Sequence, residues 1–224
     1  MTDRKGARRA AVTAGVLFLV TEVAAIAGAV LYRPLLGGAG AGGDGRAVLG
    51  ALCELLLVAA VAGTGVTLFP VVRRWGETAA LGHLCARLLE AVLILLGIVA
   101  VLALVSLHRG PAGAGAAAAE TVLVAVHDWT FLLGPNLALG LNTVLLAGLL
   151  YRSRLVPRPI AVLGLAGGPL ICASAVAVMC GLYAQLSVPG SLAALPVFGW
   201  EVSLAVWLLA KGFRRPAPVP LSPR

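Results

Sequence analysis

Six long runs of apolar residues, separated by short polar or glycine-rich segments, dominate the hydrophobic pattern of the chain. Each run reaches the length of about 20 residues that an α-helix needs to cross a bilayer. The chain has no alternating pattern with regular turns, so the sequence argues against a β-barrel. The predicted spans are residues 10–32, 47–70, 79–107, 121–150, 160–184 and 193–212.

These spans predict an all-α protein, a polytopic transmembrane bundle of six helices, because hydrocarbon leaves backbone groups no partner outside the helix itself. We expect one membrane domain over residues 1–213 and a Pro-rich, disordered cytoplasmic tail over residues 214–224. The N-terminus resembles a signal peptide, with a basic start and an apolar middle. Its apolar stretch is too long for that and contains Glu22, so we expect a retained first helix.

The composition agrees with a membrane protein. Hydrophobic residues make up 60% of the 224 residues and charged residues 12%, against about a quarter charged in a typical soluble domain. The net charge of +8 could suggest nucleic acid, but the basic residues form short groups between apolar runs, so we expect no such partner. The four cysteines lie in apolar runs without a C-x-x-C pair, and we interpret them as packing residues.

The distribution of lysine and arginine predicts the orientation of the bundle. Thirteen of the 17 basic residues fall in the N-terminal segment, the connections after the second and fourth spans, and the C-terminal segment. Three lie on the other side, and Arg87 lies inside a span. The positive-inside rule then places both termini in the cytoplasm. We expect a multi-pass protein of the cytoplasmic (inner) membrane, with the lipid bilayer as its partner.

Ionisable residues inside the spans are the main functional signal, because each costs about 2.5–3.5 kcal/mol at a helix centre. Arg87 and Glu90 are three residues apart and share a helix face; the third span is long enough for Arg87 to snorkel. His83, at the edge of the same span, is interpreted as interfacial. The predicted intramembrane polar network comprises Glu22, Glu54, Arg87, Glu90, Asn136, Asn142 and Glu201. It is either a ladder facing one interior or a set of separate, locally satisfied groups.

The fourth span carries two further features. Pro135, in the stretch "GPN", removes a backbone hydrogen bond and is expected to kink the helix. His127 and Asp128 are predicted to form a polar group near the outer face. Together with His108 and Glu120 they could in principle hold a metal. The sequence has no H-E-x-x-H, G-x-S-x-G or Walker motif, so we predict no metal site, no cofactor and no catalytic residues.

Three stretches resemble a known family: "RLLEAVLILL" in the third span, "LLYRSRLVPRPIAVLGL" between the fourth and fifth, and "LPVFGWEVSLAVWLLAKGF" in the sixth. They resemble the bacterial membrane proteins grouped as domain of unknown function 4386 (DUF4386), over roughly residues 10–213. The resemblance implies a six-helix integral membrane protein and adds no activity. The matching positions are Arg87, Glu90, Glu201, Trp207, Lys211 and Gly212.

Three functions remain open at this point, in descending order. The first is an accessory or structural protein whose charges pack helices, which predicts paired acids in a cavity-free core. The second is a small proton-linked carrier or sensor that binds a small solute between the helices. It predicts that the four acids converge on a cavity, with Arg87 as anion or counter-ion partner. The third, less favoured, is an intramembrane enzyme on lipid or prenyl substrates, with an open lateral cleft.

Overall fold

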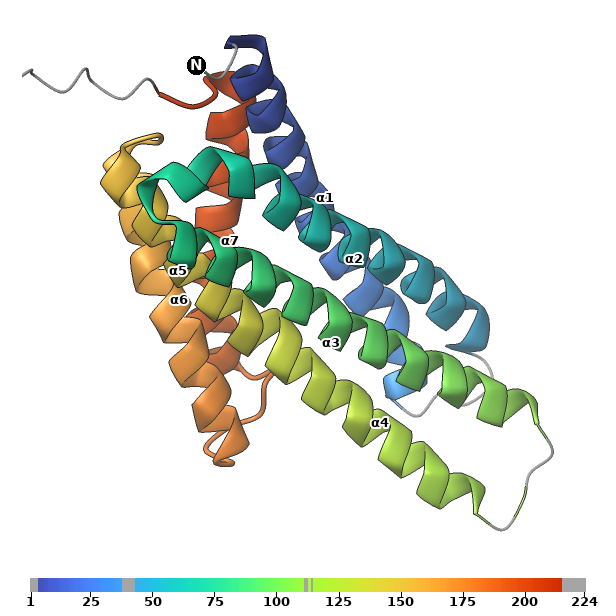
Figure 1. Cartoon of the computed structure of the whole chain (residues 1–224). Coiled ribbons are helices and arrows are strands. Elements are labelled where there is room, and N and C mark those ends of the chain that lie inside the picture. Colours follow the sequence, from blue (N-terminus) through green and yellow to red (C-terminus); the bar gives the residue numbers. More distant parts are fainter. Residues whose placement is uncertain (1–3, 38–42, 111–112, 114, 215–224) are drawn as a thin grey trace, which may run out of the picture.

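The computed structural model describes residues 4–37, 43–110, 113 and 115–214, and this part of the chain is helical apart from short connections (Figure 1). A 3-10 turn, η2 (Arg73–Trp75), extends the second helix, and a π-helical segment, η3 (Leu133–Ala138), joins the fourth to the fifth. The helices are α1 (Arg4–Leu36), α2 (Asp44–Val72), α3 (Glu77–Arg109), α4 (Ala116–Leu132), α5 (Leu139–Ser153), α6 (Arg158–Met179) and α7 (Val188–Ala210). The predicted all-α class is confirmed.

Within the described part of the chain, six helical segments are long and apolar enough to cross a membrane, which confirms the predicted bundle of six spans. They are α1, α2 with η2, α3, the continuous α4–η3–α5 segment, α6 and α7. The expected tail, residues 214–224, lies outside the described residues except for Arg214.

The fifth span ends earlier than its hydropathy predicts, at Met179 instead of residue 184. Gly181 has a φ of 74°, and the amides of Gly181 and Leu182 donate back to the carbonyls of Val178 and Ala177. This is the Schellman pattern that closes a helix at a left-handed glycine. The apolar residues that follow it belong to a connection and to the start of α7.

Both described ends of the chain lie at one end of the bundle, together with the α2–α3 and α5–α6 connections (Figure 1). We call this the basic end, because it carries the arginine groups of those two connections. Arg8 donates to the carbonyl oxygens of Leu208 and Leu209, at 3.0 and 2.7 Å, and so ties α1 to α7. We call the end with the α1–α2, α3–α4 and α6–α7 connections the opposite end.

Two separate apolar cores hold the bundle together. The core nearer the basic end surrounds the fully buried Trp200 and draws on every helix except α4. The second core, nearer the opposite end, contains residues of α1 to α4 only. The lower halves of α6 and α7 diverge from α3 and α4 in Figure 1. The bundle is therefore forked, and its two arms meet halfway along α3.

Candidate functional site

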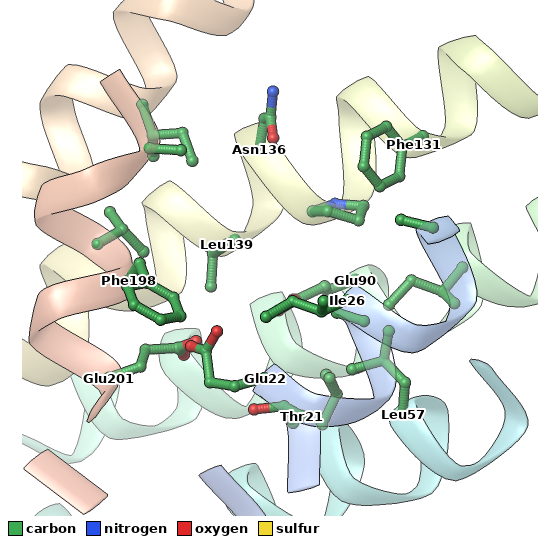
Figure 2. A pocket seen from close by; sticks show the side chains of 18 of the residues that line it. Thr21, Glu22, Ile26, Leu57, Glu90, Phe131, Asn136, Leu139, Phe198 and Glu201 are labelled. Atoms are coloured by element: carbon green, nitrogen blue, oxygen red, sulfur yellow. The ribbon is translucent and has the colours of Figure 1, made fainter. Parts of the chain in front are cut away.

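A cavity of about 280 Å³ lies where the two arms of the fork meet, and every helix from α1 to α7 as well as η3 contributes to its lining (Figure 2). Most of its wall is apolar, from side chains such as Ile26, Leu57 and Leu139. Its polar lining residues are Thr21, Glu22, Glu54, Arg87, Glu90, Asn136 and Glu201. The structure thus brings six of the seven predicted network residues to one cavity, and the seventh, Asn142, bonds to Glu90.

Arg87 is the centre of the charged cluster. Its Nη1 lies 3.3 Å from Glu90 Oε2, and its Nη2 hydrogen-bonds to Glu201 Oε1 on α7. The guanidinium also lies over the Phe18 ring, 5.2 Å from its centroid. Only 1% of the arginine is exposed, so the expectation that Arg87 snorkels is wrong. Its buried partners, Glu90 on α3 and Glu201 on α7, hold the side chain inside the bundle instead. The ion pair with Glu201 links α3 to α7.

Glu22 adds a third carboxyl group to this cluster. It projects from α1, and its carboxyl group faces that of Glu201 at the floor of the cavity (Figure 2). Unlike Glu90 and Glu201, Glu22 is only partly buried, so it is the acid of the cluster that the cavity reaches most easily. Three carboxyl groups therefore surround one guanidinium, and the site is not neutral when all three are ionised.

Glu54 enters the cavity from α2 and has its own partner. Its Oε2 accepts a hydrogen bond from the Tyr32 hydroxyl at 3.0 Å. A Cβ at Gly28 would lie 2.8 Å from Glu54 Cγ, so the glycine on α1 makes room for this side chain. Glu54 has no ion pair with Arg87. The predicted network is therefore one cavity with two polar centres, not a single bonded ladder.

Two of the buried carboxylates keep an unpartnered oxygen on the cavity. Glu54 bonds only through Oε2, and Glu90 accepts from both Arg87 and Asn142 through Oε2. Within the described part of the chain, the Oε1 atoms of Glu54 and Glu90 have no hydrogen-bond donor. Their residues are 7% and 4% exposed, so these oxygens depend on the contents of the cavity for compensation.

A file of buried polar groups continues from Glu90 toward the basic end. Asn142 of α5 donates to Glu90 Oε2 at 2.7 Å, and its backbone oxygen lies 3.1 Å from His83 Nδ1. His83 is fully buried, so its interpretation as an interfacial residue is wrong. The signal that could have identified it is spacing: residues 83, 87 and 90 share one face of α3. His83 Nε2 and Asn142 Oδ1 have no partner among the described residues, and proteins hold ordered water at such atoms.

The two residues of the predicted outer-face group contact each other but differ in burial. His127 is buried on α4, edge-on to the Tyr32 ring at a centroid distance of 5.7 Å, so it adjoins the Glu54 centre. Asp128 contacts His127 at 3.3 Å but has a side chain that is 67% exposed. His108 and Glu120 form a separate contact of 3.7 Å near the opposite end. Among the described residues, no group of three or more His, Cys, Asp or Glu side chains is arranged to hold a metal.

The expected irregularity at Pro135 is present as the π-helical segment η3, between α4 and α5. Pro135 and Asn136 both line the cavity, and Asn136 lies on the side away from Glu22 and Glu201 (Figure 2). Gly134 brings η3 close to α3, since a Cβ there would lie 3.0 Å from Leu93 Cβ. Single π-turns inside α-helices are frequent at functional sites, which fits the location of this one on the cavity wall.

The fold and the cavity define the class: a multi-pass membrane protein of six helices, with a charged cluster on an internal cavity. The chain matches the family model described as "Domain of unknown function (DUF4386)" over residues 13–212, and it belongs to this family. The resemblance in the sequence is thereby confirmed. A search of curated proteins and a search of solved structures found no match.

Proposed function

We propose that the protein is a proton-linked carrier or sensor that binds a small solute in the cavity between its helices. The observation that carries this proposal is the convergence of all four intramembrane glutamates on one cavity. An accessory protein whose charges only join helices would pair its acids in a filled core. The contacts of Arg87 with Glu90 and Glu201 fit that role, but the location of Glu22 and Glu54 does not.

The balance of charge supports the proton linkage. Glu22, Glu90 and Glu201 surround the single guanidinium of Arg87 in a site of low dielectric. Adjacent carboxylates in such a site do not all ionise without a compensating cation, so the cluster holds protons when no cation is present. A solute that changes the charge of the cavity therefore changes the number of bound protons.

The file from Glu90 through Asn142 to His83 supports a route for these protons to the basic end. Chains of histidine, acidic and amide groups inside a membrane protein are typical of proton pathways. We propose that the basic end is the cytoplasmic side of the inner membrane, because it gathers the arginines. Protons would then exchange with the cytoplasm, and the solute with the fork at the opposite end.

Dicyclohexylcarbodiimide tests this proposal without knowledge of the solute, since it reacts with protonated carboxyl groups in apolar surroundings. The full-length protein in detergent is treated over a range of pH, and the adducts are mapped by mass spectrometry. We expect an adduct at Glu22 that decreases as the pH rises and the carboxyl group ionises. Absence of adducts at Glu22, Glu54, Glu90 and Glu201 at every pH would overturn the proposal.

A further inference from the structure

We propose that the solute is an organic cation with an apolar, aromatic body; this inference rests on the proposed function of the cavity. Four arguments support it: the charge of the lining residues, the unpartnered oxygens, the nature of the walls and the position of the entrance.

The charged groups that face the cavity are mostly acidic. The lining residues include Glu22 from α1, Glu54 from α2, Glu201 from α7, and both Arg87 and Glu90 from α3. The elements α4, η3, α5 and α6 contribute no charged lining residue. The cavity thus has four carboxyl groups and one guanidinium in its lining, and a cation is the ligand that relieves this excess of acidic groups.

Arg87 is not available to recognise an anion. Both of its terminal nitrogens contact carboxylates, and only 1% of the residue is exposed. An anion in the cavity would therefore meet carboxylates first and would have to displace Glu90 or Glu201 to reach the guanidinium. These contacts favour Arg87 as the counter-ion of the two buried acids over Arg87 as the partner of an anion.

Two carboxylate oxygens that belong to lining residues have no hydrogen-bond partner in the described part of the chain. Glu54 Oε1 and Glu90 Oε1 have no donor within the described residues, although both side chains are more than nine-tenths buried and line the cavity. Glu22, partly buried, is the accessible acid beside them. A cation that enters the cavity would replace the protons of the cluster and balance the negative charge of these carboxylates.

The walls suit an apolar body with an aromatic ring. Phe131 and Phe198 line the cavity from opposite arms of the fork, and Ile26 and Leu57 add further apolar surface (Figure 2). Aromatic faces attract cations through the ring quadrupole. The volume of about 280 Å³ is at the lower limit of small-molecule sites, so the ligand is of the size of a single substituted ring.

The entrance favours a molecule that partitions into the bilayer. Ile26 on α1 and Phe198 on α7 line the cavity and are 55% and 44% exposed. Exposed apolar side chains on two of the lining helices fit a lateral entrance from the hydrocarbon region. An amphiphilic cation can enter sideways with its apolar part first, whereas a strongly hydrated ion cannot.

The test compares phenyltrimethylammonium with its neutral isostere, tert-butylbenzene, and with an anion of similar size, benzenesulfonate. Binding to the full-length protein in detergent is measured as an increase in the melting temperature and as protection of Glu22 from dicyclohexylcarbodiimide. We expect phenyltrimethylammonium to stabilise and to protect, less so at low pH because protons compete with it. Tert-butylbenzene should bind more weakly and benzenesulfonate not at all.

The variants Glu22→Gln and Glu54→Gln should each weaken phenyltrimethylammonium binding by about tenfold or more, because each removes a carboxylate charge that attracts the cation. Glu77→Gln is the matched control, because it removes an exposed carboxylate at the basic end and should leave binding unchanged. Glu54→Gln keeps the test valid if Glu22→Gln does not fold.

Equal binding of tert-butylbenzene, preferred binding of benzenesulfonate, or no effect of either glutamine variant would overturn the cation class. So would the absence of binding by all three probes. In each of these cases the adduct at Glu22 would still support the proton-linked cavity. Absence of an adduct at all four glutamates, by contrast, would overturn the proposed function.

Discussion

At the scale of single residues, the arrangement around Arg87 decides how the bundle tolerates charge in hydrocarbon. One guanidinium compensates two buried carboxylates, and its contact with Phe18 adds an aromatic face. Removal of the cation leaves acids without compensation, whereas neutralisation of one acid leaves the remaining pair intact. The two kinds of substitution should therefore have very different costs.

We predict that Arg87→Leu destabilises the protein by about 3–5 kcal/mol, because it leaves Glu90 and Glu201 buried without a counter-ion. Glu90→Gln should remain folded, since an amide preserves the size and the hydrogen-bonding capacity of the side chain. Melting temperature and monodispersity in detergent measure both effects.

The double variant Arg87→Leu with Glu201→Leu is the control, and it should recover part of the stability that Arg87→Leu loses. If Glu90→Gln abolishes the folded protein as completely as Arg87→Leu does, the charges serve to hold the helices, and the accessory function is the correct one.

A second residue-scale prediction concerns His83. His83→Gln should leave the affinity for phenyltrimethylammonium unchanged, because His83 does not line the cavity. It should slow the release of protons at the basic end, since it alters the last buried group of the file. A pH-sensitive dye outside or inside proteoliposomes measures the release when the cation is added. An unchanged rate on both sides would exclude His83 from the pathway.

The sequence predicted the identity of the polar residues better than their connections. Each glutamate was recognisable because a charge in an apolar run is rare. Which glutamates contact each other depends on how the helices are rotated about their axes. The spacing of polar residues along a single helix does not contain this information. His83 was missed for a related reason: near the edge of a span, hydropathy does not distinguish a residue at the interface from one buried by a neighbouring helix.

At the scale of elements, glycines determine how closely the helices approach. A Cβ at Gly164 on α6 would lie 2.7 Å from the Trp200 ring on α7 and 2.9 Å from Ala147 Cβ on α5. Both distances are shorter than van der Waals contact, so α6 packs between its neighbours only with glycine at this position. The apolar core nearer the basic end, which surrounds Trp200, depends on this close approach of α6 to α5 and α7.

We predict that Gly164→Val destabilises the bundle by about 1–3 kcal/mol through overpacking against Trp200. Gly148→Ala on α5 is the matched control, because a Cβ there would meet nothing within 4 Å. It should be neutral or stabilising, by up to about 1 kcal/mol from helix propensity. Thermal unfolding in detergent compares the two variants. Equal stability of Gly164→Val and the native protein would mean that the core can shift around this position.

Element boundaries were predictable where polar residues interrupt the apolar pattern and not elsewhere. The α2–α3 and α5–α6 connections both contain arginine, the second also contains Pro157, and both were located from the sequence. The end of α6 was placed too late, because Leu182 and Leu186 continue the apolar pattern beyond the helix. There the backbone of Gly181 ends the helix, and hydropathy does not register a left-handed glycine.

At the scale of the whole molecule, the fork is the feature that creates the cavity. The two apolar cores stabilise the two ends of the bundle independently, and the charged cluster lies at the level where they separate. A side chain that fills the space between the arms should therefore remove binding without disturbing either core. No pattern in the sequence predicts the fork, because hydropathy reports the length of spans and not their divergence.

We predict that Ala194→Trp on α7, which places a large ring in the cavity, abolishes phenyltrimethylammonium binding. Leu195→Trp is the control: residue 195 is 57% exposed to lipid and does not line the cavity. Both variants should keep the melting temperature of the unliganded protein within a few degrees, since neither position belongs to a core. Binding that persists in Ala194→Trp would place the cation site elsewhere.

The hydrogen bonds of Arg8 to the last turn of α7 bear on how such a cavity changes its width. They clasp α1 and α7 at the basic end, while the same two helices flank the entrance farther along. Two helices that are fixed to each other at one end can move apart at the other end by a hinge motion. Ligand entry and exit would then move the halves of α1 and α7 that are farther from Arg8, with Arg8 at the hinge. Without these hydrogen bonds, the two helices would slide along each other instead.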